Sequence, residues 1–86
     1  MIIETDIKEE IAKAERNFKE YNSYHEGFAI ILEEVDELWD LVKTKGKTPQ
    51  EHYLEAKHVA CTAIRYMKLC VRKLWQHMMK DEKNNN

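Results

Sequence analysis

The stretch "FAIILEEVDELWDLVK", residues 28–43, decides the fold, because it places five acidic side chains within a run of large apolar residues. Its main apolar residues recur every three or four positions, the spacing of one face of an α-helix: Phe28, Ile31, Leu32, Val35, Trp39 and Val42. A second face carries Ile30, Glu34, Glu37 and Leu41, so two carboxylates lie between apolar side chains. This pattern predicts a long helix with two distinct faces.

The composition of the whole chain favours helix over sheet. The 86 residues include two glycines and one proline, and they are rich in Glu, Lys, Ala, Leu and Ile. A chain this short buries only about 60 to 65% of the surface that its unfolded form exposes, so its core is marginal. We expect an all-α fold with a single domain over residues 1–80 and a disordered tail over 81–86.

Charge and hydropathy exclude two classes of partner. The formal net charge of −2 gives no basic surface for a phosphate backbone, so a nucleic-acid polymer is not expected as a ligand. No apolar run approaches the roughly 20 residues that span a bilayer, and the N-terminus lacks the pattern of a signal peptide. We therefore expect a cytoplasmic protein with no membrane partner.

Capping signals set the expected bounds of the helices. A short oxygen-bearing side chain three residues before a Glu forms a capping box, which satisfies two backbone donors at a helix start. Three pairs have this spacing: Asp6 with Glu9, Ser23 with Glu26, and Thr48 with Glu51. Pro49 suits the first position of the third helix. We predict helices at about 7–21, 24–44 and 49–79.

The first and third helices also carry apolar stripes. On the first they are Ile7, Ile11, Ala14, Phe18 and Tyr21; on the third they are Tyr53, Ala56, Ala60, Ala63, Met67, Cys70, Leu74 and Met78. These residues, with the main stripe of the second helix, are the expected core. The third helix has a second face as well, with Glu51, Glu55, His58, Thr62, Arg65 and Leu69. A chain too small to cover both faces is expected to form a homodimer or homotetramer, as an oligomeric helical bundle.

A metal site follows if the second faces meet. Glu34, Glu37 and Glu55 would then converge in a partly desolvated space, where like charges repel and need a cation. Carboxylate oxygens suit Mg²⁺, with Mn²⁺ possible, and the remaining coordination positions of such an ion accept phosphate oxygens. The alternative is a solvated helix face, on which Glu34 and Glu37 pair with Lys43 or Lys45.

The acidic motif and its spacing point to one family. "EEVDE", with Glu33, Glu34 and Glu37, is followed 18 residues later by Glu55. This pattern resembles the E-E-x-x-E and E-x-x-D motifs of the MazG-like, all-α nucleoside triphosphate pyrophosphohydrolases, over about residues 23–70. The resemblance implies that Glu34, Glu37 and Glu55 hold Mg²⁺. His58 stands where the family has Asp, which can shift the metal preference towards Mn²⁺, Fe or Zn, lower the affinity, or mark a chain without activity.

The resemblance also implies a reaction and roles for further residues. Water, activated by the metal, attacks a nucleoside triphosphate between the α and β phosphates and releases the monophosphate and pyrophosphate. Glu33 and Glu37 are the candidate catalytic acids, with Glu33 orienting or deprotonating the water. The candidate metal ligands are Glu34, Glu37, Glu55 and His58, and the candidate substrate-binding residues are Arg65, Lys57, Tyr24 and His25.

Two other functions remain open at this point. Glu55-x-x-His58 matches the Glu-x-x-His element of di-iron or di-manganese carboxylate bundles, for which a homodimer supplies two copies and Glu34 or Glu37 gives the extra acid. Iron in the purified protein would favour this reading. The other alternative is a non-catalytic helical oligomer or an inactive MazG relative, which would bind no nucleotide.

Overall fold

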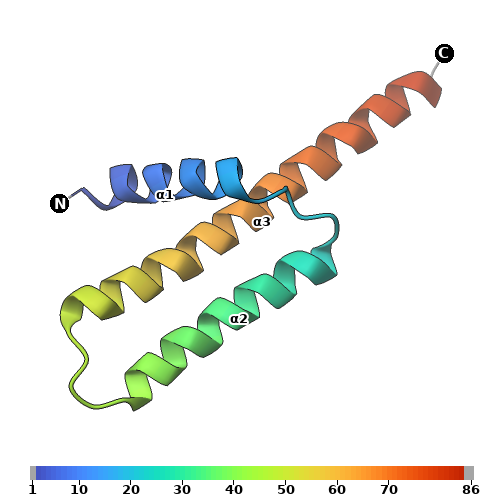
Figure 1. Cartoon of the computed structure of the whole chain (residues 1–86). Coiled ribbons are helices and arrows are strands. Elements are labelled where there is room, and N and C mark those ends of the chain that lie inside the picture. Colours follow the sequence, from blue (N-terminus) through green and yellow to red (C-terminus); the bar gives the residue numbers. More distant parts are fainter. Residues whose placement is uncertain (1, 85–86) are drawn as a thin grey trace.

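The described part of the chain, residues 2–84 of the computed structural model, folds into three helices and contains no strand, and side chains are described for residues 2–80. The helices are α1 (Ile3–Asn17), α2 (Tyr24–Lys43) and α3 (Pro49–Asn84). α1 runs along α3 in the same direction and α2 in the opposite direction (Figure 1). Both pack against α3, and over the described residues they do not pack against each other. The all-α prediction is therefore confirmed.

The capping chemistry of α2 and α3 follows the sequence prediction. The Ser23 hydroxyl accepts a hydrogen bond from the backbone N–H of Glu26 at 3.1 Å. At the start of α3, the Thr48 hydroxyl accepts from the Glu51 N–H at 3.1 Å, and the Glu51 carboxylate accepts from the Thr48 N–H at 2.8 Å. This reciprocal pair is a complete capping box. The Thr48 N–H also lowers the pKa of Glu51, because it stabilises the carboxylate.

The predicted bounds of the first helix, 7–21, are wrong at both ends, because α1 spans Ile3–Asn17. Asp6 does not cap the helix but lies in its first turn. Its carboxylate accepts hydrogen bonds from the Tyr53 hydroxyl at 2.6 Å and from Lys57 Nζ at 3.1 Å. These two partners, Tyr53 first, lower the pKa of Asp6. Tertiary partners on α3 thus take the side chain that the local pattern assigned to a cap.

The linker between α1 and α2 is fastened to α3 by its backbone. Arg65 donates a hydrogen bond to the carbonyl of Lys19 at 2.9 Å, and Arg72 donates to the carbonyl of Tyr21 at 2.7 Å. The Tyr21 side chain is only 2% exposed, and its hydroxyl donates to the carbonyl of Thr62 at 3.3 Å. α1 ends early because residues 18–21 do not continue the helix. Within this segment, Lys19 and Tyr21 make hydrogen bonds with α3 instead.

Gly27 decides which face of α2 turns towards α3. A Cβ atom at this position would lie 2.7 Å from Cδ2 of Tyr66 and 2.8 Å from Cδ2 of Tyr21, which is closer than real Cβ contacts. The absence of a side chain at Gly27 therefore lets this side of α2 lie close to the rings of Tyr21 and Tyr66. Helical spacing places Ile30, Glu34 and Leu41 on this same side.

The two faces of α2 and α3 are consequently reversed relative to the expected core. The buried apolar residues are few: Ile11, Tyr21, Cys61 and Leu69. Many residues of the predicted core stripes are instead exposed in the single chain: Phe18, Phe28, Leu32, Val35, Trp39, Val42, Ala56, Met67, Cys70, Leu74 and Met78. That part of the core prediction is wrong for one copy of the chain, because the close approach at Gly27 turns the second faces inward.

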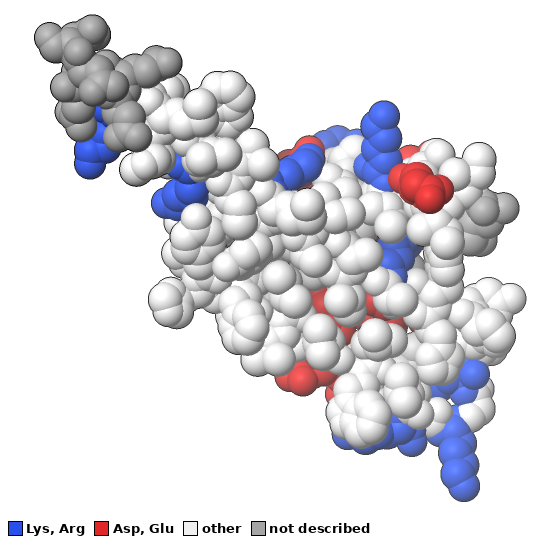
Figure 2. Space-filling view, turned by 180° about the vertical axis from the view of Figure 1, so that it is seen from behind, with Lys and Arg blue, Asp and Glu red and all other residues white. Residues whose placement is uncertain are grey.

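A large uncharged surface results. The face of the molecule seen in Figure 2 is mostly uncharged, with a few acidic side chains near its middle and Lys and Arg towards its ends. α3 also extends well past α1 and α2 (Figure 1), and it continues to Asn84, where a disordered tail was expected from residue 81. Residues 85 and 86 lie outside the described part. None of the described helices has a segment both long and apolar enough to cross a membrane.

Candidate metal centre

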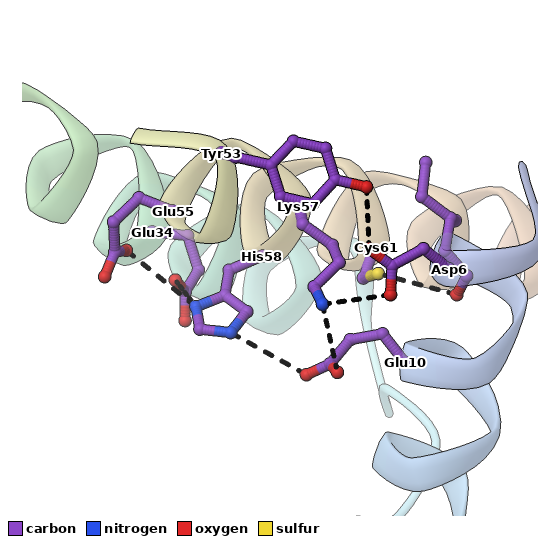
Figure 3. Close-up of polar contacts among 9 residues, drawn as sticks. Asp6, Glu10, Glu34, Tyr53, Glu55, Lys57, His58 and Cys61 are labelled. Carbon is purple, nitrogen blue, oxygen red and sulfur yellow. Dashed lines mark hydrogen bonds and ion pairs between the residues drawn. The ribbon is translucent and has the colours of Figure 1, made fainter. Parts of the chain in front are cut away.

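The inward faces of α2 and α3 bring three predicted ligands together. Glu34 comes from α2, and Glu55 and His58 come from successive turns of α3. Nδ1 of His58 lies 3.8 Å from Oε2 of Glu34 and 3.8 Å from Oε2 of Glu55 (Figure 3). One ligand atom from each residue falls within 4.8 Å of the other two. Glu37, one helical turn after Glu34, is exposed.

Both carboxylates of this group have one oxygen atom without a hydrogen-bond partner. The Glu34 and Glu55 side chains are each 24% exposed. Their Oε2 atoms are buried and make no hydrogen bond. Desolvation raises the pKa of Glu34, and the neighbouring Glu37 carboxylate raises it further. Leaving a buried acceptor unsatisfied costs about 1 to 3 kcal/mol, more if it is charged. The cluster therefore destabilises the chain unless a cation joins it.

The donor set fits a divalent metal ion. Two ligands of one ion lie at most about 4.2 Å apart, twice a typical bond of about 2.1 Å. The separations of 3.8 Å fall inside this limit, and small side-chain movements bring the remaining separation within it. The two orphaned oxygens both lie 3.8 Å from Nδ1 of the imidazole. Glu34, Glu55 and His58 are thus the residues that can hold a metal.

α1 adds a residue that the sequence analysis did not single out. Oε1 of Glu10 lies 3.7 Å from Nε2 of His58, on the side of the ring away from Glu34 and Glu55 (Figure 3). Oε2 of Glu10 lies 3.9 Å from Nζ of Lys57, which also pairs with Asp6. The sequence offers six acids between residues 4 and 20, so no local signal marks Glu10. Only the packing of α1 along α3 selects it.

A groove of about 600 Å³ is lined by Glu34 and His58, two of the three residues of this group. α1 and α2 form its walls and α3 its floor, with the linker at the far end. Its lining residues are Glu10, Ala14, Phe18, Lys19, Tyr21, Asn22, Glu26, Ile30, Glu33, Glu34, His58, Cys61, Thr62 and Arg65. Glu10, Glu33 and Glu34 line the groove with His58, and Glu26, near the linker, lines it with Lys19 and Arg65. The Arg65 guanidinium lies 4.7 Å from the centre of the Tyr21 ring, so a cation is held over an aromatic face.

Of the other predicted site residues, two line the groove and three do not. Glu33 is exposed and lines the groove, as does Arg65. Lys57 is engaged by Asp6 and Glu10 and does not line the groove. Tyr24 packs against Tyr66, with ring centres 5.7 Å apart, and His25 is exposed; neither lines the groove. The structure therefore does not bring Lys57, Tyr24 and His25 to this groove.

A larger hollow, of about 770 Å³, lies beside the linker, where α1 ends against α3. Two of the cations that line it are paired with acids, Lys68 with Glu15 and Arg72 with Glu20. These contacts fasten α1 and the linker to α3. The smaller groove is lined by Glu34, which has an orphaned oxygen, and by His58, and it is the better candidate for a site.

Comparison with known proteins gave no match to a family model, to a curated protein or to a solved structure. The function is therefore argued from the residues and the geometry of the groove.

Proposed function

We propose that the chain is a metal-dependent nucleoside triphosphate pyrophosphohydrolase, which converts a nucleoside triphosphate to the monophosphate and pyrophosphate. One observation carries the proposal. Two buried carboxylate oxygens without partners, from Glu34 and Glu55, lie 3.8 Å from an imidazole nitrogen, and the groove lined by Glu34 and His58 is also lined by Lys19 and Arg65. The MazG-like acidic motif of the sequence agrees with this arrangement.

The roles of the residues follow from their positions. Glu34, Glu55 and His58 would hold the metal, Mg²⁺ or Mn²⁺, and Glu37 would complete the acidic face from the next turn of α2. The bound ion offsets charge on the phosphate oxygens and lowers the pKa of water. Glu33 lines the groove beside Glu34 and accepts a proton from the attacking water. The water oxygen bonds to phosphorus as the bond between the α and β phosphates breaks.

The rest of the groove suits the remainder of a nucleotide. Arg65 and Lys19 lie where a phosphate chain extends from the metal. Phe18 lines the groove with a side chain that is 66% exposed, so its ring is free to stack on a base. In this proposal Phe18 takes the role that the sequence analysis gave to Tyr24 and His25.

The proposal includes assembly with a second copy of the chain. Ten large apolar side chains of α2 and α3 are 40 to 64% exposed: Phe28, Leu32, Val35, Trp39, Val42, Met67, Val71, Leu74, Trp75 and Met78. Together they present on the order of 1,000 Å² of apolar surface, if each has a total near 200 Å². A standard interface buries about 800 Å² per partner, and monomers rarely expose such an apolar area. A homodimer or homotetramer covers this surface by packing α2 and α3 against their copies.

Release of pyrophosphate tests the function. The purified chain is incubated with each common nucleoside triphosphate and with Mg²⁺ or Mn²⁺, and we expect the monophosphate and pyrophosphate in equal amounts. Glu34→Gln should abolish the release, while Asp36→Asn, which changes an exposed acid on the same helix, should not. No turnover of any triphosphate with either ion, or equal turnover by Glu34→Gln, contradicts the proposal.

A dinuclear carboxylate centre is the second candidate function. The observation that favours it is Nδ1 of His58, which faces the same point as Glu34 and Glu55. One chain thus offers one Glu and one Glu-x-x-His, half of the ligand set of a di-iron bundle, and two copies complete it. About two iron or manganese ions per pair of chains in the purified protein, with no hydrolysis, would favour this candidate over the hydrolase.

A further inference from the structure

His58 has different neighbours at its two ring nitrogens. Nδ1 faces the orphaned oxygens of Glu34 and Glu55, each at 3.8 Å, whereas Nε2 faces Glu10 at 3.7 Å. Figure 3 shows the ring between α1 on one side and the two acids on the other. A neutral imidazole has one nitrogen that donates and one that accepts or binds a metal. The surroundings of His58 therefore distinguish its two nitrogens.

Glu10 is well held on its side of the ring. Its side chain is 24% exposed, and its second oxygen lies 3.9 Å from Nζ of Lys57. Lys57 is anchored in turn by Asp6, at 3.1 Å, and Asp6 also accepts from the Tyr53 hydroxyl. With a cation at Nδ1, the ring proton would lie on Nε2, which faces the Glu10 carboxylate at 3.7 Å. In metal sites, a carboxylate on the second nitrogen of a histidine fixes the tautomer and makes the ligand more basic.

We infer that Glu10 positions His58 to bind a divalent ion through Nδ1, and that the centre therefore takes a transition-metal ion such as Mn²⁺, Co²⁺ or Zn²⁺ in preference to Mg²⁺. An imidazole ligand suits transition metals, whereas Mg²⁺ prefers oxygen ligands and retains its waters. The inference rests on the metal site of the proposed function, and it does not require hydrolysis. Glu10 is a positioning residue, because it acts through His58.

Cobalt binding tests the inference without an activity assay. The full-length chain, freed of metal, is titrated with Co²⁺ and the visible absorption of the ion is recorded. We expect a saturable band, and we expect Mg²⁺ in hundredfold excess to leave it in place. Glu10→Gln should weaken Co²⁺ binding by about 10- to 100-fold, the usual cost of losing such a partner. Glu9→Gln is the matched control on the same helix and should bind as the parent does.

His58→Asp should reverse the preference, so that Mg²⁺ displaces Co²⁺ more easily than from the parent. Equal Co²⁺ affinities for the parent and Glu10→Gln, or displacement by an equal concentration of Mg²⁺, overturn the inference. Circular dichroism checks that each variant keeps its helices.

Nitrogen-15 NMR of the unaltered chain with Zn²⁺ gives a readout that needs no variant. We expect the metal on Nδ1 of His58 and a proton on Nε2; the opposite tautomer overturns the role of Glu10. Co²⁺ binding without hydrolysis of any triphosphate would leave this inference standing and remove the proposed function. Hydrolysis with Mg²⁺ and no binding of Co²⁺ would do the reverse.

Discussion

The two faces of α2 differ in a way that is unusual for a surface helix. The face that packs against α3 carries Gly27 and Glu34, and it encloses a carboxylate oxygen that has no partner. The opposite face presents Phe28, Val35 and Trp39 to the surroundings. An ordinary amphipathic helix buries its large apolar residues and exposes its acids. Burial within one chain thus follows close backbone approach, and the large apolar side chains are left exposed.

The largest expected effect comes from the acids that lie between α2 and α3. Glu55→Gln removes a proposed metal ligand, and it should lower kcat/KM for triphosphate hydrolysis by at least about 100-fold, because even a residue that only supports a ligand is worth 10- to 100-fold. Steady-state assays of pyrophosphate release measure the loss. Glu4→Gln, an exposed acid at the start of α1, is the control. If Glu55→Gln retained the parental rate, the group of Glu34, Glu55 and His58 would have no part in catalysis.

The exposed apolar face of α2 should control assembly and not hydrolysis. Trp39→Glu places a charge on a side chain that is 56% exposed in the single chain and buried in the proposed interface. We expect association to weaken by about 2 kcal/mol, roughly 30-fold in Kd, as for an interface hot spot. Size-exclusion chromatography with light scattering measures the mass. Trp39→Phe should retain the assembly, and a parent chain that is monomeric at every concentration would contradict the account.

A substitution at Gly27 tests the difference between the two faces of α2, because Gly27 lies where α2 packs closely against Tyr66 of α3. Gly27→Ala should lower the free energy of unfolding by about 2 kcal/mol, since the added Cβ overpacks against the rings of Tyr21 and Tyr66. Gly46→Ala is the matched control, at a residue with φ of 81° and open space around it. It should cost about 1 kcal/mol from backbone strain alone. Urea denaturation measures both, and an equal or smaller loss at Gly27 would count against the close approach.

The smallest expected effect concerns the contact that holds α1 in place. The folded chain lowers the pKa of Asp6, so its ionised form stabilises the fold above the unfolded pKa, and this contribution is lost as the pH falls. Asp6→Asn should therefore be less stable than the parent at pH 7, and the difference should shrink as the pH falls below about 4. Thermal unfolding from pH 3 to 7 measures it. A difference that stays constant with pH would show that the charge of Asp6 does not matter.

Local chemistry accounts for what the sequence predicted correctly about the fold. Ser23 and Thr48 cap α2 and α3 through hydrogen bonds within three residues, which a sequence shows directly. Asp6 has the same spacing to a Glu, yet Tyr53 and Lys57 engage it from 47 and 51 residues away. Contacts at that separation depend on how the helices pack, so the start and end of α1 were not predictable from the same signal.

The same difference between local spacing and long-range packing applies to the candidate site. Helical spacing places Glu55 and His58 on one face of α3, and Glu34 on one face of α2, so their meeting was expected once those faces packed together. Which faces would turn inward could not be read from hydropathy, because both helices have two apolar sides. Glu10 was missed for a different reason, since its role depends on the packing of a third helix.

Thermal unfolding with and without metal tests the central claim most directly, namely that Glu34 and Glu55 are crowded around His58 to hold a cation. In EDTA, Glu34→Gln should be at least as stable as the parent, because the neutral amide relieves repulsion and desolvation. With Mn²⁺ at about 100 times its Kd, the parent should gain about 2.7 kcal/mol, roughly 10 °C or more in Tm for a chain of this size, and the variant much less. The same Tm for the parent with and without metal, or an equal rise in both proteins, would contradict the account.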